Sequence, residues 1–245
     1  MRAIAIAIVL LCPISAIYGQ TRSASPNLSR KVAFFSVKQQ NLIDALLSFG
    51  AQERIPIGID YIDKAAFRQR MNLEFRERKV REILDALTHP LGYRWSMAGA
   101  VVSVTHDGAL LGRSNLLNTR IPQFRIGETS MHEASLALSL HLYFVLNPQS
   151  GGIAGDSPGG NLAFRVGPVD LQNATVRDIL NQIVSQHSNG AWIVQQPPWT
   201  MGKDLGYGLW EVLEYDRTDA EYSRELQVRG LGLQAGLKST GDKSR

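Results

Sequence analysis

Cysteine is almost missing from this chain of 245 residues, in which Cys12 is the only one. It lies in an apolar amino-terminal stretch that we expect to be removed, so the mature protein is predicted to have no thiol. This excludes disulfides, thiolate metal sites and cysteine nucleophiles. The preceding Val9-Leu10-Leu11 lacks the small residue expected before a lipidated cysteine. The mature protein must therefore be held together by its hydrophobic cores.

Long apolar runs are also lacking. Residues 3–11 form the one unbroken run near the start, after Met1-Arg2, and Pro13 ends it. A membrane anchor is the alternative, but an anchor needs about 20 apolar residues. The short basic start, the apolar run and the small residue at the end are typical of a secretory signal peptide. We expect residues 1–19 to be this signal, cut after Gly19, which predicts a periplasmic or secreted protein.

Charge of one sign is not concentrated anywhere in the chain. The formal net charge is +4, and lysine and arginine alternate with acids. Nucleic-acid proteins usually gather basic residues on one stripe. We therefore expect no nucleic-acid partner, and no transmembrane segment once the signal is removed.

An internal repeat organises the rest of the sequence. Residues 80–87 (VREILDAL) and 176–183 (VRDILNQI) correspond at an offset of 96 residues, each after a strand-like segment. A tryptophan follows each copy, Trp95 and Trp192. Fixed offsets of this kind indicate a duplicated structural unit.

Each copy reads as strand, helix, strand, strand, helix and closing strands. In the first copy, residues 42–49 and 80–87 carry apolar residues at the i, i+3, i+4, i+7 spacing of half-buried helices. The predicted fold is α+β, with two repeated β-α-β-β-α-β units, each with two helices packed on a small sheet. We place the units at residues 31–106 and 120–198, joined by a linker at 107–119. A carboxyl-terminal extension covers 199–245, packed in part and disordered at its end.

The second copy contains a glycine-rich insertion, residues 147–160, which we interpret as a mobile loop. It includes Gly155-Asp156-Ser157-Pro158-Gly159, which fits the G-x-S-x-G pattern of hydrolases. That nucleophile elbow needs a buried strand before the serine and a helix directly after it. Neither is expected around Ser157, so a serine hydrolase is the weaker interpretation.

The five histidines form no metal-binding pattern. His132 and His141 are nine residues apart and hence out of phase on one helix. His89 and His187 come at the ends of the two repeated helices, where an imidazolium can offset the helix dipole. We predict no catalytic residue, no metal and no cofactor, and expect the protein not to be an enzyme.

The densest basic stretch lies between residues 64 and 81. Glu74, Glu77 and Glu82 interleave its lysines and arginines. An acidic partner is one interpretation. A solvated edge strand and helix face is the interpretation that the interleaving favours.

The first copy resembles the secretin and TonB short N-terminal (STN) domain. The matching residues are 35–37, 41–49, 57–61, 80–87, 91–95 and 101–104, which together span about residues 32–105. The second copy follows the same plan more weakly. The resemblance implies a periplasmic signalling or docking module, which in that family precedes the channel of secretins or the plug and barrel of siderophore receptors at the cell outer membrane and contacts inner-membrane partners. The partner expected here is accordingly another envelope protein. No barrel-length series of strands follows residue 198, so no pore or receptor is expected on this chain.

These observations favour a non-enzymatic, exported protein-interaction module, with pairing at an exposed sheet edge as its mechanism. A small-ligand or cell-wall-fragment binder that uses the cleft between the two copies, with the 147–160 loop as a lid, is the alternative. The identity of the partner and the oligomeric state stay open.

Overall fold

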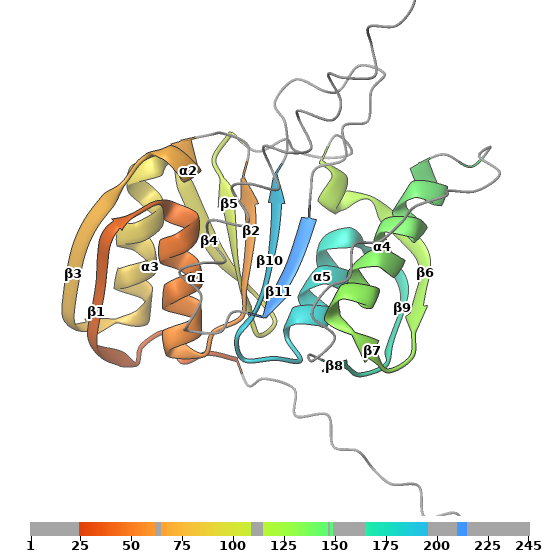
Figure 1. The fold of residues 1–245 in the computed structure, drawn as a ribbon, viewed down its shortest axis with the longest axis horizontal. Helices are drawn as coiled ribbons and strands as arrows, with labels where there is room; N and C mark the ends of the chain where they lie inside the picture. Colours follow the sequence, from red (N-terminus) through yellow and green to blue (C-terminus); the bar gives the residue numbers. More distant parts are fainter. Residues whose placement is uncertain are drawn as a thin grey trace, which may run out of the picture.

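The computed structural model of the protein describes residues 25–61, 65–108, 115–146, 148, 165–195 and 210–214. The α+β class is confirmed (Figure 1). Several sequence predictions concern residues outside the described ranges: the signal peptide with Cys12 and its cut after Gly19, most of the 147–160 loop with Ser157, and the extension apart from residues 210–214.

The first half of the chain runs from β1 to β5. The elements are β1 (Lys31–Gln40), α1 (Leu42–Glu53), β2 (Ile57–Tyr61), α2 (Ala65–Arg68), β3 (Met71–Lys79), α3 (Val80–Thr88), a 3₁₀ turn (His89–Leu91), β4 (Tyr93–Ala98) and β5 (Val101–His106).

The second half starts with a 3₁₀ turn (Leu116–Asn118). It continues with β6 (Arg120–Ile126), β7 (Thr129–Ser130), α4 (Met131–Leu146), β8 (Arg165–Val166), β9 (Val169–Thr175), α5 (Val176–Val184), β10 (Gly190–Gln195) and β11 (Trp210–Glu214).

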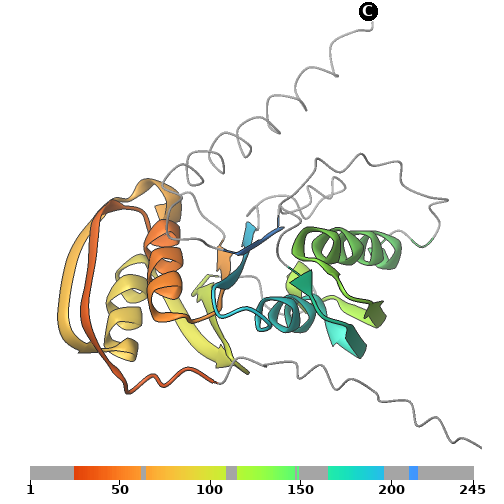
Figure 2. The ribbon, with the colours of Figure 1, turned by 60° about the horizontal axis from the view of Figure 1, so that its bottom comes forward.

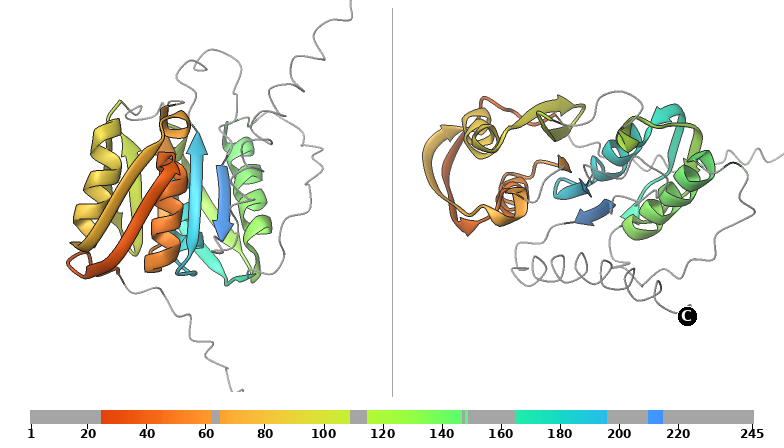
Figure 3. Two further views of the ribbon diagram at one scale, coloured as in Figure 1. Left: turned by 60° about the vertical axis from the view of Figure 1, so that its left-hand side comes forward. Right: turned by 90° about the horizontal axis from the view of Figure 1, so that it is seen from above.

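Strands from both halves form one central sheet of five strands in the order β11-β10-β2-β5-β4. Strand β10 pairs with β2 in parallel, β2 with β5 in parallel, and the outer pairs are antiparallel. Three antiparallel pairs, β1–β3, β6–β9 and the short β7–β8, lie apart from this sheet. In Figures 1 and 3, α1 and α3 lie between β1–β3 and the central sheet, and α4 and α5 lie between that sheet and β6–β9.

Helices flank the central sheet on both sides (Figure 2), and a hydrophobic core lies on each of its faces. The first core includes Ala191 and Ile193 of β10, and the second includes Trp192 and Val194 of the same strand. Since neighbouring residues of a strand point to opposite faces, β10 is buried on both sides. The two halves are therefore joined by a shared strand layer and not by surface contact alone.

This arrangement differs from the expectation that each unit packs its helices on its own small sheet. The closing strand β10 of the second half instead adds to β2 of the first. The physical reason lies in the composition of β10. A continuous apolar run is stable where both faces of its strand are buried, as in the middle of a sheet covered on both sides. Residues 191–194 are such a run, whereas β4 alternates polar and apolar residues.

Local signals account for the helix starts next to the sheet. Asn41 caps α1, where its side chain accepts a hydrogen bond from the Asp44 amide. Thr175 and Asp178 form a reciprocal capping box at the start of α5. Such boxes satisfy amides that have no partner in the first turn of a helix.

Candidate functional site

Strand β4 is one of the two edge strands of the central sheet in the described residues, with β11 at the other end, and its side away from β5 is called the open edge. It pairs with β5 through a two-residue turn at Gly99, whose φ of 65° suits glycine. In an antiparallel pair, alternate residues direct their backbone groups toward the partner strand or away from it. The Val102 amide donates to the Pro56 carbonyl on the far side of β5, at 2.9 Å. The backbone groups of Val102 thus point away from β4, so its cross-strand partner Met97 directs its own N–H and C=O away from β5, toward the open edge. Trp95, two residues earlier in β4, does the same.

The β1–β3 and β6–β9 pairs carry features that protect their edges from further pairing. Strand β1 has an irregular register near its end, and β3 carries a run of charged side chains with Glu77 at a φ of 51°. Strand β6 contains Pro122, and β9 has Asn173 at a φ of 49°. Charges, prolines and local distortions are the usual defences of edge strands. Strand β4 has a regular register, no proline and one charge, Arg94.

A tryptophan in β4 is tied to the helix beside it. The indole N–H of Trp95 donates to the Asp85 carboxylate of α3 at 2.7 Å, and the ring packs against the first core. In the second half, the indole N–H of Trp192 donates to Asn181 of α5 at 2.8 Å. Asp85 and Asn181 are 96 residues apart, the same offset that separates the left-handed residues Glu77 and Asn173 of the preceding strands.

The edge of β10 that corresponds to this open edge is occupied by β2. Gly58 of β2 lies beside Trp192, and a Cβ built there would be 2.2 Å from the indole ring. Only glycine leaves room for the ring at this close approach. The tryptophan ring therefore covers the strand that pairs alongside.

An ion pair completes this junction. Arg177 of α5 donates to the carboxylate of Asp60 at 2.9 Å and to the hydroxyl of Ser103 at 3.3 Å. Its guanidinium also lies 5.7 Å from the centre of the Trp192 ring. The Asp60 side chain is 0% exposed and also accepts from Asn115 at 3.3 Å. Arg177 thus reaches from its helix over the tryptophan to the neighbouring strand.

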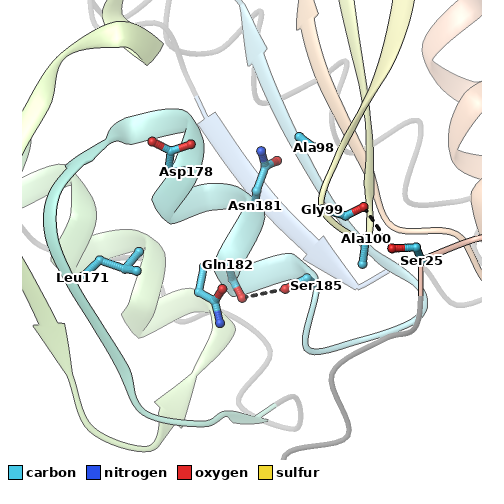
Figure 4. Close-up of a pocket in the computed structure, with 9 residues that line it drawn as sticks. All are labelled: Ser25, Ala98, Gly99, Ala100, Leu171, Asp178, Asn181, Gln182 and Ser185. Carbon is cyan, nitrogen blue, oxygen red and sulfur yellow. Dashed lines mark hydrogen bonds between the residues drawn. The ribbon is translucent and has the colours of Figure 1, made fainter.

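A pocket of about 480 Å³ lies where the β4–β5 turn faces α5 (Figure 4). Its lining includes Ala98 and Gly99 from the turn, and Asp178, Asn181 and Gln182 from the helix. Asn181 is buried and uses its side-chain oxygen for Trp192, so its amide NH₂ is the group available to an occupant. The pocket joins residues of both halves of the chain.

The histidines singled out from the sequence are not brought together. His89 directly follows α3, with its ring 3.5 Å from Asp85. The ring of His187 contacts the carbonyl of Arg165 in β8 at 2.7 Å. His141 packs edge-on against Phe124, and the side chain of His132 is outside the described set. Within the described residues, no three His, Asp or Glu side chains gather as metal ligands.

The basic stretch of β3 lies on the surface, and its charges are paired locally. Arg76 contacts Glu74 at 2.9 Å, and Arg78 contacts Glu82 at 3.7 Å. This matches the interpretation of a solvated strand and helix face. Arg81 of α3 is exposed and has no ion pair among the described residues.

One titratable group is strongly perturbed, far from the open edge. Hydrogen bonds from the Thr129 hydroxyl and from the Ser130 amide and hydroxyl lower the pKa of Glu133, in the first turn of α4, from 4.5 to about 2. The acid also closes a capping box with Ser130, which accepts from the Glu133 amide at 3.1 Å. This pKa therefore has a structural cause in the helix start.

Helix α4 also carries partly exposed apolar residues, which are Leu136, Leu140, Phe144 and Val145. None of the helices in the described ranges combines the length and apolarity needed to cross a bilayer.

Compared with known proteins, the chain matches no family model and no curated protein. The resemblance to the STN domain thus rests on the residues given above.

Proposed function

We propose that the protein is an exported docking module, related to the STN domains of secretins and TonB receptors, that binds an extended segment of another envelope protein. We further propose that it consists of two β-α-β-β-α-β units at residues 31–106 and 120–198. The matched tryptophan bonds, the matched left-handed residues and the 96-residue offset support this duplication. The apolar start of the chain supports a periplasmic location.

The open edge of β4 is the observation that carries the docking proposal. An extended segment can add to such an edge through backbone hydrogen bonds, with side chains giving the specificity. The molecule already uses this mode once, because β2 lies on the corresponding edge of β10. The first unit thus offers at β4 the kind of surface that the second unit uses internally.

A cross-linking experiment tests this proposal. A photoreactive residue at the exposed Ser96 of β4 should capture one envelope protein in source cells, and the same residue at Lys38 of β1 should not. Met97→Pro removes an amide that faces the open edge and should abolish capture, whereas the matched Met97→Ala should retain it. Capture that is equal at both positions, or insensitive to Met97→Pro, would contradict docking at β4.

The pocket beside the β4–β5 turn supports a second candidate function. It lies between the two halves and contains amide and carboxylate groups, as a site for a small polar ligand does. A cell-wall fragment or a siderophore would then be the ligand. A shift of the melting temperature with muropeptides or siderophores that Gln182→Trp removes would support this function, and no shift across the panel would exclude it.

A further inference from the structure

We infer that the partner segment contains a Gly-x-Asp motif, in which the glycine lies beside Trp95 and the aspartate pairs with Arg81. This inference rests on the proposed docking function and names the chemistry of its partner. It takes the internal β10–β2 junction as the template for what pairs with β4.

The first step concerns the tryptophan. Trp95 and Trp192 hold the same place in their units. The indole N–H of each donates to a side chain of the preceding helix, Asp85 or Asn181, and these two helix residues are 96 positions apart. The ring of Trp192 covers the strand beside β10 and leaves space only for Gly58. The Trp95 side chain is half-buried, and its strand has no neighbour on one side among the described residues. A strand that adds to β4 therefore needs a glycine where this ring would cover it.

The second step concerns the arginine. Arg81 lies four residues before Asp85 on α3, as Arg177 lies four residues before Asn181 on α5, so each pair shares one helix face. Arg177 reaches past its tryptophan to Asp60, two residues after Gly58 in the neighbouring strand. Arg81 is exposed and without an ion pair among the described residues. An acid two residues after the glycine of a docked strand gives Arg81 the partner that Arg177 has.

The direction of the strand follows from the same junction. Strand β2 runs parallel to β10, with Gly58 beside Trp192 and Asp60 beside Val194. A docked segment in this register runs parallel to β4, with its glycine beside Trp95 and its aspartate beside Met97. The intervening residue points to the opposite face of the sheet, where it does not contact Arg81.

The probe for this inference is a peptide that copies residues 55–61 of the chain, Ile-Pro-Ile-Gly-Ile-Asp-Tyr, followed by two lysines for solubility. Matched peptides carry leucine in place of glycine, or asparagine or lysine in place of aspartate. Binding to the chain from Gln20 onward is measured by fluorescence anisotropy. The proteins compared are the unchanged chain, Arg81→Glu, Met97→Pro, and Arg78→Ala as a control for loss of an exposed basic residue.

We expect the leucine and asparagine peptides to bind about tenfold more weakly, as for the loss of one charge-assisted hydrogen bond or one close ring contact. Arg81→Glu should weaken binding of the aspartate peptide and restore binding of the lysine peptide. Arg78→Ala should leave the binding of both peptides unchanged. Peptides that all bind equally, or none that binds, would overturn the Gly-x-Asp motif. If Met97→Pro still abolishes cross-linking at Ser96, the docking function then stands without the motif. If Met97→Pro leaves cross-linking at Ser96 intact, both the docking function and the Gly-x-Asp motif are contradicted.

Discussion

Removal of Arg177 is expected to destabilise the protein strongly, because its partner is buried. Arg177→Ala leaves the Asp60 carboxylate, 0% exposed, without its cation and removes the guanidinium beside Trp192. Breaking a buried ion pair by removing one partner costs about 3–5 kcal/mol in the free energy of unfolding. The Arg177 side chain is itself 21% exposed, so we expect the lower half of that range.

The chain supplies its own matched control for this change. Arg81 occupies the position 96 residues earlier, on the surface of α3, and Arg81→Ala should alter the free energy of unfolding by less than about 0.5 kcal/mol. Urea unfolding followed by tryptophan fluorescence measures both variants. Adding Asp60→Asn to Arg177→Ala should recover part of the loss, since no charge then stays buried alone. Equal effects of Arg81→Ala and Arg177→Ala would refute the assignment of Arg177 as the link between the halves.

Two further predictions concern stability. Gly58→Ala should lower the free energy of unfolding by about 3 kcal/mol or more, because its methyl group would overlap the Trp192 ring. Gly127→Ala is the control, since open space surrounds this glycine, and it should lower the free energy of unfolding far less in the same urea titration. Glu133 has a pKa lowered to about 2 in the folded protein, so the stability it contributes is fully present above its unfolded pKa and lost as pH falls toward 2. The melting temperature of Glu133→Gln should accordingly lie below that of the unchanged chain at pH 7, and the gap should narrow between pH 4.5 and 2. A gap that stays constant with pH would rule out this assignment.

The helices and strands of the first half were predictable, because their apolar spacing and turn residues act locally. The predicted helices at residues 42–49 and 80–87 lie within α1 and α3. Their signals need no knowledge of which strands become neighbours.

The shared central sheet was not predicted, although a signal was present. Residues 191–194 are continuously apolar, which indicates a strand buried on both faces. The alternation of Gly58 and Asp60 in β2 is typical of a solvent-facing side, yet that side packs against Trp192 and Arg177. Which strand covers it depends on a contact across 117 residues of sequence, and a local pattern does not carry that information.

The open edge also needed the structure. From the sequence, β4 is one of several short strands with an aromatic residue. Its place at the end of the central sheet follows from β10 having paired with β2 and not with β4. The protected edges of β1, β3, β6 and β9 distinguish it from those strands, and β11 at the other end of the central sheet carries two acids, Glu211 and Glu214.

Hydrogen exchange at the backbone amides of Trp95 and Met97 is the most direct measurement of docking at β4. Both amides face the open edge, so they should exchange rapidly in the free protein. With the glycine- and aspartate-containing peptide bound, both should become protected, while amides of β1 and β3 stay unchanged. Unaltered exchange at Trp95 and Met97 in the presence of a bound partner, with protection at another strand, would contradict docking at this edge.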